Sequence, residues 1–326
     1  MIKIDDVIWT LTEKCDGKCV HCGLWKKRIN YNDELDLDII ENIVSNSLLK
    51  NLIQAHITGG EPHISPKYIP LIELLVKYHP SIRIHSPISG MYPMHHYAIS
   101  KYVLKITKNY LIDVSIDGPE EINDKLRGKG MFENAVKTIS LLKKLDLKRL
   151  RMQFTVYPEN YEYIEWAKNF SEKLGVGLYI NFGRVSVRFG KDEEKDTDEF
   201  SFSIDQINKI DELLRKIDYD KGPYKWRYIW QMKWWRGEKF TYDCYMGFRS
   251  VDIDPYGNVY PCLLWKKELY MGNLRDFNGD LRALYQSPKA QEVLKYIKEK
   301  RCQPCSFSCA IKASIDGNKG IEFNPN

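Results

Sequence analysis

The stretch CDGKCVHC, residues 15–22, sets the interpretation of the whole sequence. Its three cysteines, Cys15, Cys19 and Cys22, have the spacing C-x3-C-x2-C, and thiolates are the ligands that iron–sulfur clusters take. A [4Fe–4S] cluster has four irons, so three cysteines leave one iron open to a further molecule. The stretch therefore predicts a cluster with one open coordination site.

Other interpretations of this stretch stay open at this point. The three cysteines also share one face of a helix, although Asp16, Gly17 and Lys18 are poor residues for a buried helical turn. A zinc site needs a fourth ligand, and His21 beside Cys22 is badly placed to bind the same ion. A disulfide cannot use three thiols evenly.

The composition is that of an ordinary globular protein, with 43% hydrophobic and 29% charged residues. No segment is long and apolar enough to span a membrane, and the N-terminus lacks the apolar core of a signal peptide, so we expect a cytoplasmic protein without a membrane partner. The net charge of +5 is mild for 326 residues, which makes nucleic acid an unexpected partner. Eight cysteines without a secretion signal indicate metal or redox chemistry rather than a disulfide framework.

Strands alternate with helices in the hydrophobic pattern of the first part of the chain. Strands are expected over 7–12, 52–58, 81–86, 110–116, 149–157 and 176–183, and helices over 37–49, 66–79, 95–106, 131–145 and 160–174. This alternation predicts parallel βαβ units, and α/β folds place their active sites at the carboxyl ends of such strands. Periodicity alone does not separate a barrel from a doubly wound sheet.

A second motif, Gly59-Gly60-Glu61-Pro62, follows the expected strand 52–58. Glycines let the backbone approach a ligand closely, although a run of this kind on its own is more often a simple turn. Together with the cysteine stretch one βα unit earlier, the motif resembles the signature of the radical S-adenosylmethionine (radical SAM) superfamily. The resemblance implies an α/β fold, an open, partial (β/α)6 TIM-like barrel whose cluster iron is chelated by SAM.

The resemblance also implies a set of SAM-binding residues. The GGEP motif would contact the amino group of SAM, and His21 would lie near the adenine through its backbone. The stretch 115–135, SIDGPEEINDKLRGKGMFENA, resembles the fourth-strand segment of members with an auxiliary cluster domain. The complete set is His21, Gly59, Gly60, Glu61, Ser115, Asp117, Thr155 and Asn181.

Ser115 and Asp117 alternate with apolar residues, so both side chains leave the same strand face, where they could hydrogen-bond a ribose. The plain alternative is that Asp117 only caps a turn with Gly118. Asp124 and Arg127 are in the same way explained by a surface ion pair.

The last third of the sequence holds five further cysteines. Residues 254–257, DPYG, indicate the turn of a β-hairpin whose arms carry Cys244 and Cys262, and CQPCSFSC follows a helix expected over 281–300. The arrangement resembles the SPASM/twitch auxiliary domain of radical SAM enzymes, and five cysteines fit the single-cluster twitch form better than the seven-cysteine SPASM form. The resemblance implies an auxiliary [4Fe–4S] cluster on Cys244, Cys262, Cys302 and Cys305, with Cys309 as a spare thiol or a replacement for one of the pair. A four-cysteine zinc site is the alternative.

These motifs divide the chain into a radical SAM partial barrel core (1–200), a helical and aromatic linker region (201–243) and a small α+β twitch/SPASM-like auxiliary domain (244–326). The charged run 191–199, KDEEKDTDE, is expected to be a solvated loop, and a helix is expected over 203–217. In the linker, Trp226, Trp230 and Trp234 recur at helical spacing among lysines and arginines. This favours an amphipathic helix packed on the barrel over a surface that stacks bases or binds an acidic peptide.

The function implied by the resemblance is reductive cleavage of SAM to a 5′-deoxyadenosyl radical, which abstracts hydrogen from a substrate carbon while the auxiliary cluster accepts an electron. The expected substrate is a ribosomal peptide or protein, and the alternative is a small metabolite such as a sugar alcohol or cofactor precursor. Ferredoxin or flavodoxin is the implied electron donor. A non-enzymatic alternative is a zinc-stabilised module that binds RNA or protein.

Overall fold

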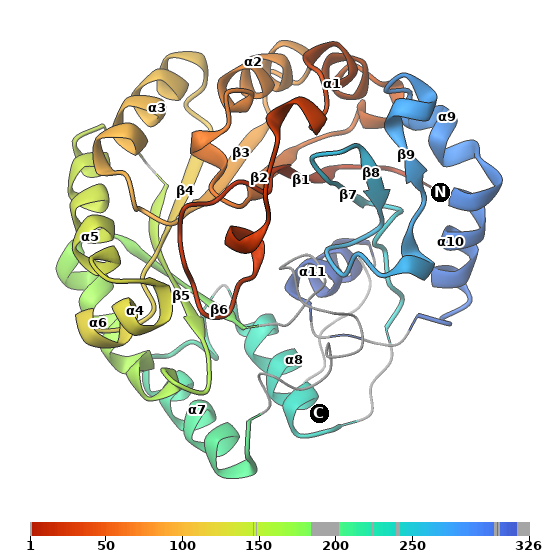
Figure 1. Cartoon of the computed structure of the whole chain (residues 1–326). Helices are drawn as coiled ribbons and strands as arrows, with labels where there is room; N and C mark the ends of the chain where they lie inside the picture. The colour runs from red at the N-terminus through yellow and green to blue at the C-terminus, as the bar shows by residue number, and fades with distance from the viewer. Residues whose placement is uncertain are drawn as a thin grey trace.

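Six parallel strands form the curved sheet at the centre of the molecule (Figure 1). The computed structural model describes residues 2–145, 147, 149–183, 202–222, 224–238, 242–302, 305 and 307–317. Within these residues the strands follow one another in chain order, each parallel to the next: β1 (Asp6–Thr12), β2 (Gln54–Gly59), β3 (Arg83–Ile88), β4 (Tyr110–Ser115), β5 (Leu150–Val156) and β6 (Gly177–Phe182). This unbroken order confirms the predicted partial barrel, because a doubly wound sheet reverses its strand order.

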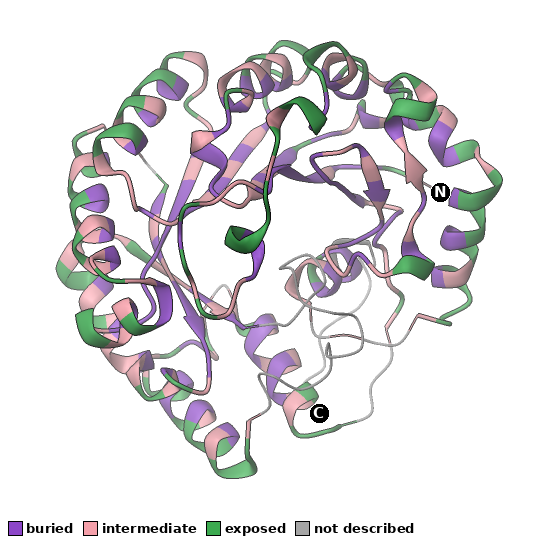
Figure 2. Cartoon of the chain, in the orientation of Figure 1, coloured by how far each residue is buried: buried purple, intermediate pink, exposed green. Residues whose placement is uncertain are grey.

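The strands are apolar on one face and polar on the other. Ile84, Ile112 and Phe154 are fully buried on the face that the helices cover, and Figure 2 shows buried strands inside a ring of helices with exposed outer sides. Their neighbours, such as Asp113 and Arg151, point to the opposite face because side chains alternate along a strand. The interior of the barrel is therefore lined by polar groups.

The helices that surround the sheet in Figure 1 lie close to the predicted ranges. They are α1 (Leu37–Val44), α2 (Tyr68–Tyr78), α3 (Pro93–Ile106), α5 (Met131–Leu142), α6 (Ile164–Leu174) and α7 (Ile204–Lys216). Short 3-10 helices lie between them and in the last third: η1 (Leu24–Lys26), η2 (Tyr31–Asp33), η3 (Ser47–Leu49), η4 (Pro62–Ile64), η5 (Lys143–Leu145), η6 (Tyr161–Tyr163), η9 (Lys267–Leu269) and η10 (Leu274–Phe277).

One barrel helix was not predicted. The helix α4 (Glu120–Arg127) fills the segment between β4 and α5, beginning after Pro119 and ending at Gly128, whose φ of 115° is left-handed. Its first turn carries two glutamates and its last turn two basic residues, the order that the helix dipole favours. The many charged residues of this segment hide its helical period.

The helix α8 (Lys225–Trp235) confirms the predicted linker helix but packs by a different face. The tryptophan stripe is at best half-buried, and Trp234 is 38% exposed. The buried residues are Arg227, Tyr228, Gln231 and Met232. The tryptophans therefore do not form the buried face of α8. The helix lies beside the edge strand β6 (Figure 1), and Arg227 on its buried face donates to the side chain of Asn181 in that strand.

The last third of the chain continues the central sheet. The strand β7 (Ser250–Ile253) pairs in parallel with β1, and β8 (Asn258–Tyr260) and β9 (Gly272–Asn273) follow in antiparallel order. The predicted hairpin turn is present, with the Asp254 carboxylate accepting hydrogen bonds from the amides of Tyr256 and Asn258 at 2.9 and 2.8 Å. The sheet therefore crosses the predicted boundary at residue 244, and the three-part division of the chain stays a prediction.

The helix expected over 281–300 is two helices, α9 (Leu281–Gln286) and α10 (Pro288–Lys298). Pro288 has no amide proton to continue α9, and Ser287 caps α10 by accepting from the Ala290 amide at 3.2 Å. A further helix, α11 (Ser308–Gly317), contains the last cysteine, Cys309, and was not predicted.

No helix in the part of the chain that the structure describes is long and apolar enough to cross a membrane. The charged run 191–199 lies outside the described residues.

Candidate functional site: two cysteine groups at the carboxyl edge of the sheet

The cysteine loop leaves the carboxyl end of β1 and turns sharply at Gly17. A Cβ atom on Gly17 would lie 3.4 Å from the Cys15 sulfur and 3.9 Å from the Cys19 sulfur, so both sulfurs face the same side of the turn. The Cys22 amide donates to the Cys19 carbonyl at 3.2 Å, which keeps the third cysteine on this turn. All three thiols are free of disulfides, as the cluster prediction requires.

Burial raises the pKa of the Cys15 thiol to about 12 and also raises the pKa of Cys19, although Arg127 opposes the latter shift. The two sites also repel one another as thiolates. Thiolates at these positions therefore need a positive partner, which the irons of a cluster provide. The donor set fits a cluster by its chemistry.

The end of α4 holds the cysteine loop in place. The Val20 amide donates to the Leu126 carbonyl at 2.9 Å, and the Cys19 thiol lies 3.9 Å from the Arg127 carbonyl. Arg127 is itself buried, and its Nε donates to the Asp117 carboxylate at 2.6 Å. The predicted surface pair between Arg127 and Asp124 is therefore wrong, because Asp124 instead accepts from backbone amides at the start of α5.

The two glycines of the GGEP motif allow β2 to touch the start of the cysteine loop. A Cβ atom on Gly59 would lie 2.1 Å from the Thr12 carbonyl oxygen, and one on Gly60 would lie 2.1 Å from that of Lys14. The Gly60 amide donates to the Thr12 carbonyl at 2.7 Å, and the Glu61 amide donates to the Lys14 carbonyl at 2.9 Å. Only glycine fits this approach, so the motif fixes its carboxylate beside the cysteine loop.

The two carboxylate oxygens of Glu61 differ in their hydrogen bonding. Its Oε2 accepts from the Ser89 amide at 2.8 Å and from the Ser89 hydroxyl at 2.5 Å. Glu61 is only 2% exposed, and its Oε1 is buried without a hydrogen-bond partner among the described residues. A buried carboxylate oxygen of this kind fits an ammonium group, which is what SAM would present here.

Both carboxylate oxygens of Asp117 accept hydrogen bonds from other residues of the chain. Its Oδ2 accepts from Arg127, its Oδ1 accepts from the Thr155 amide at 2.8 Å, and its backbone carbonyl accepts from Asn160 at 2.8 Å. The carboxylate is fully buried, and it joins β4, α4 and β5. Its predicted contact with a ribose stays a prediction, and these bonds give Asp117 a positioning role in addition.

The remaining predicted SAM residues lie along the same edge. Ser115 ends β4 and is buried, and Thr155 lies directly opposite Asn181 in the pairing of β5 with β6. His21 stacks on the Tyr157 ring, with centroids 4.6 Å apart and planes at 22°. The structure thus brings the predicted residues to one edge, and their individual contacts with SAM stay predictions.

The second cysteine group gathers around Cys305. As a thiolate, Cys305 raises the pKa of Cys244, Cys262, Cys302 and Cys309, in each case after the larger effect of burial. The Tyr242 hydroxyl donates to the Cys305 carbonyl at 2.7 Å and lies 3.4 Å from its sulfur. Cys309, in the first turn of α11, belongs to this group as much as Cys302 does. A choice between them as fourth ligand stays a prediction.

In the described parts of the chain, no three His, Cys, Asp or Glu side chains converge on the position of one metal ion. In a [4Fe–4S] cluster each thiolate binds a different iron, so convergence on a single point is not what the predicted clusters require.

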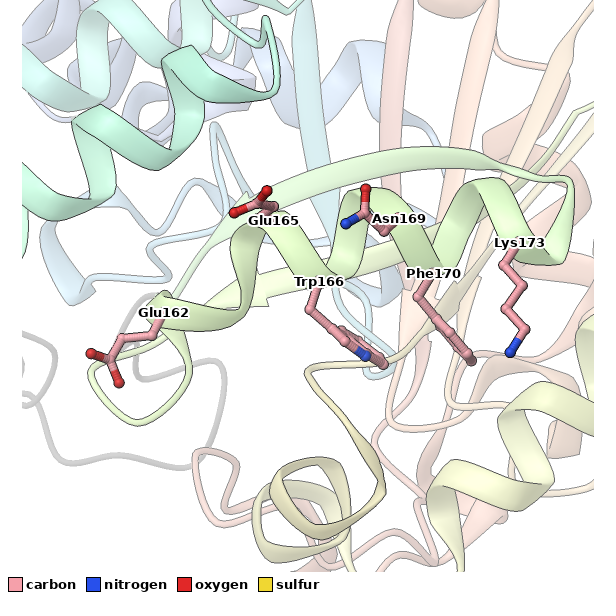
Figure 3. A pocket seen from close by; sticks show the side chains of 6 residues that line it. All are labelled: Glu162, Glu165, Trp166, Asn169, Phe170 and Lys173. Atoms are coloured by element: carbon pink, nitrogen blue, oxygen red, sulfur yellow. The ribbon is translucent and has the colours of Figure 1, made fainter.

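Several residues that shape this edge carry no signal in the sequence. Ser89 holds Glu61 and comes from a segment that no motif marks. Arg127 lies within the quoted stretch 115–135, but nothing in that stretch marks its side chain as the partner of Asp117. A surface hollow is lined by Glu162 of η6 and by Trp166, Phe170 and Lys173 of α6, and Figure 3 shows these side chains. It is separate from the cysteine loops.

The parallel partial barrel, the three-cysteine loop after β1 and the glycine motif after β2 together define the class of SAM-dependent iron–sulfur enzymes. Residues 9–170 match the sequence model of the Radical SAM superfamily, and residues 244–310 match that of SPASM, an iron–sulfur cluster-binding domain. The chain belongs to the radical SAM superfamily and carries a SPASM domain. Its cofactors are therefore SAM and a [4Fe–4S] cluster, with auxiliary iron–sulfur cluster binding in the SPASM domain. Whether the five cysteines hold one cluster, as in the twitch form, stays a prediction.

Two curated relatives are similar over much of this chain. The chain is 25% identical, over 87% of its length, to the antilisterial bacteriocin subtilosin biosynthesis protein AlbA of Bacillus subtilis, and it spans 60% of that protein. It is also 25% identical, over 55% of its length, to the mycofactocin maturase MftC of Mycolicibacterium smegmatis, and it spans 45% of that protein. The chain thus spans about half of each relative.

Two solved structures share the fold. The structure of anSMEcpe with bound AdoMet has a TM-score of 0.65 at 18% identity, covering 94% of this chain and 87% of that one. Streptococcus suis SuiB bound to precursor peptide SuiA has a TM-score of 0.65 at 14% identity, covering 89% of this chain and 66% of that one. These likenesses confirm the predicted architecture.

Proposed function

We propose that this enzyme oxidatively modifies a ribosomally made peptide or protein. The observation that carries the proposal is the joint presence of a second thiol group around Cys305 and of relatives named for subtilosin biosynthesis and mycofactocin maturation. A protein of the same fold has been solved with a precursor peptide bound. We therefore extend the substrate class of these relatives to this chain.

In this proposal Cys15, Cys19 and Cys22 hold the SAM cluster, and the vacant Oε1 of Glu61 accepts a hydrogen bond from the SAM ammonium. When bound, the cluster and SAM supply a 5′-deoxyadenosyl radical that takes a hydrogen atom from a substrate carbon. The backbone hydrogen bonds from Gly60 and Glu61 to the cysteine loop keep the Glu61 carboxylate and the three cysteines at a fixed separation. His21, Ser115, Asp117, Thr155 and Asn181 border the SAM and substrate pocket.

The auxiliary cysteines have a different task. Four thiolates fill every iron position of a cubane, so Cys244, Cys262, Cys305 and either Cys302 or Cys309 would leave no iron for a substrate. A cluster held there would accept one electron from the substrate radical that hydrogen abstraction leaves, and would pass that electron on. A ferredoxin or flavodoxin supplies the electron that starts the reaction.

A peptide encoded by a short gene beside that of the enzyme tests this function. We incubate it anaerobically with the reconstituted enzyme, SAM and dithionite and follow the peptide by mass spectrometry. The proposal expects the loss of two hydrogens together with 5′-deoxyadenosine formation. Cys262→Ala should retain SAM cleavage but lose peptide oxidation, whereas Cys19→Ala should lose both. Equal loss in the two variants contradicts the division of roles.

A small-metabolite substrate is the second candidate. The chain is 28% identical, over 47% of its length, to the Fe-coproporphyrin III synthase of Methanosarcina barkeri, spanning 37% of that protein. The same assay with small-molecule extracts in place of the peptide separates the two candidates. Substrate-dependent 5′-deoxyadenosine formation with an extract below peptide size, and none with peptides, favours the metabolite.

A further inference from the structure

Arg227 is a buried arginine that has no carboxylate partner among the residues that the structure describes. It lies on α8 and is 3% exposed. Its Nη2 donates to the Asn181 side-chain oxygen at 2.8 Å, while its Nε and Nη1 are buried and have no hydrogen-bond partner in the described part of the chain. An arginine carries its charge permanently, and a buried unpaired charge costs free energy, so Arg227 has the features of a site for a negatively charged group.

Its position is at the polar face of the edge strand. Tyr179 and Asn181 alternate with the buried apolar residues Ile180 and Phe182, which face the covering helix. The guanidinium carbon of Arg227 lies 4.6 Å from the centre of the Tyr179 ring, so Arg227 reaches the interior side of β6. Asn181 is the penultimate residue of this strand, at the edge that carries the cysteine loop.

The neighbouring charges do not neutralise Arg227. A second charged group contacts the same Tyr179 ring: Arg151, which is joined to the Asp113 carboxylate by two hydrogen bonds of 2.7 Å. His85 Nε2 donates to the same carboxylate at 2.8 Å, and burial lowers the pKa of His85, so this imidazole adds no charge at neutral pH. Arg151 also lies over the Tyr179 ring, at 4.4 Å. Among the described residues, Arg151 is balanced by Asp113, so Arg227 leaves a net single positive charge beside Tyr179.

We propose that Arg227 binds a carboxylate of the substrate at the barrel interior beside β6. Its Nε and Nη1 are unpartnered N–H donors among the described residues, and donors on a permanent cation bind carboxylate oxygens strongly. A single negative charge also matches the excess charge of the described residues around it. The site rests on the proposed function for the identity of the ligand as a substrate, and a peptide offers such a group as an Asp or Glu side chain or as its C-terminus. Both sources share the same chemistry.

Binding of small carboxylates to the reconstituted enzyme tests the site directly. The probes are N-acetyl-aspartic acid amide, which carries a side-chain carboxylate, N-acetylglycine, which carries a terminal one, and N-acetylasparagine amide, which carries none. The tryptophans on α8 report binding by fluorescence. We expect saturable binding of at least one acid, at least about tenfold tighter than the amide, and at least about a tenfold loss in Arg227→Met. Arg227→Lys should retain part of the affinity.

The matched control is Arg236→Gln, which removes an exposed arginine one residue beyond α8 that pairs with Asp211. It should bind the probes as the wild type does. Equal affinity for acid and amide, no binding of either acid, or undiminished binding in Arg227→Met would overturn the proposal.

Stability supplies a readout that does not depend on any ligand. If the Arg227 charge is buried without an anion when no substrate is bound, Arg227→Met removes that unpaired charge. The urea midpoint of this variant should then equal or exceed that of the wild type. If Arg227 only braces β6, the midpoint should fall, and that result contradicts the site. Probe binding with no peptide modification would mean that the proposed peptide function is wrong while the carboxylate site stands.

Discussion

Replacing Arg127 by Met should destabilise the enzyme by about 3–5 kcal/mol, because it leaves a carboxylate buried without its cation. The structure sets this magnitude. Asp117 is fully buried, the Arg127 side chain is 8% exposed, and their 2.6 Å contact is the only ion pair of either group among the described residues. After the change, the Asp117 side chain keeps only the bond from the Thr155 amide.

The effect should reach the cluster. The end of α4 holds the cysteine loop through the Val20 amide and the Cys19 thiol, so a loosened α4 should also lower the iron retained after anaerobic desalting. Urea unfolding followed by tryptophan fluorescence measures the stability, and iron analysis of the same samples measures the cluster. Lys125→Met, an exposed change on the same helix, should alter stability by no more than about 0.5 kcal/mol.

A double variant identifies the cause. Arg127→Met combined with Asp117→Asn removes the orphaned charge and keeps an acceptor for the Thr155 amide, so it should recover part of the lost stability. A loss below about 1 kcal/mol in Arg127→Met, or a double variant less stable than the single one, refutes the assigned role of the pair.

Three further changes probe neighbouring parts of the site. Gly60→Ala should cost about 2 kcal/mol or more and weaken SAM binding, since its Cβ would lie 2.1 Å from the Lys14 carbonyl oxygen. Gly222→Ala, whose Cβ would meet its nearest atom at an ordinary 3.7 Å, is the control in calorimetry, and equal effects contradict the close approach. Glu61→Gln should raise the dissociation constant for SAM about tenfold without changing iron content, and an unchanged constant argues against an ammonium at Oε1. Burial raises the pKa of Asp254 to about 6, above its unfolded value of about 4, so stability should be fullest below pH 4 and fall by about 3 kcal/mol as pH rises through 6. Asp254→Asn should lack this slope in urea midpoints measured from pH 4.5 to 7.5, and parallel curves would contradict it.

The sequence was sufficient for the barrel because its signals are local. The spacing of Cys15, Cys19 and Cys22, the glycines at 59 and 60 and the alternation of apolar strands with helices each lie within a few residues. The hairpin turn at 254–257 was equally visible, since Asp254 and Gly257 are turn formers at fixed spacing.

What could not be predicted depends on contacts between distant segments. The pairing of β7 with β1 joins residues about 240 positions apart, and short strands of this kind carry no mark of their partner. Arg127 pairs with Asp117 and not with Asp124, because Arg127 is the last residue of α4 and its side chain is buried. The helix α8 buries the face that carries Arg227 and leaves its tryptophan stripe at best half-buried. Tertiary context decides such cases over local pattern.

The central claim is that three thiolates hold a cluster whose open iron takes SAM. Anaerobic reconstitution of the wild type with iron, sulfide, SAM and dithionite tests it most directly. Two cubanes predict about eight irons per chain and formation of 5′-deoxyadenosine, and Cys15→Ala, Cys19→Ala and Cys22→Ala should each abolish that product and retain about four irons. Zinc in place of iron, or 5′-deoxyadenosine formation that survives these changes, would contradict the account.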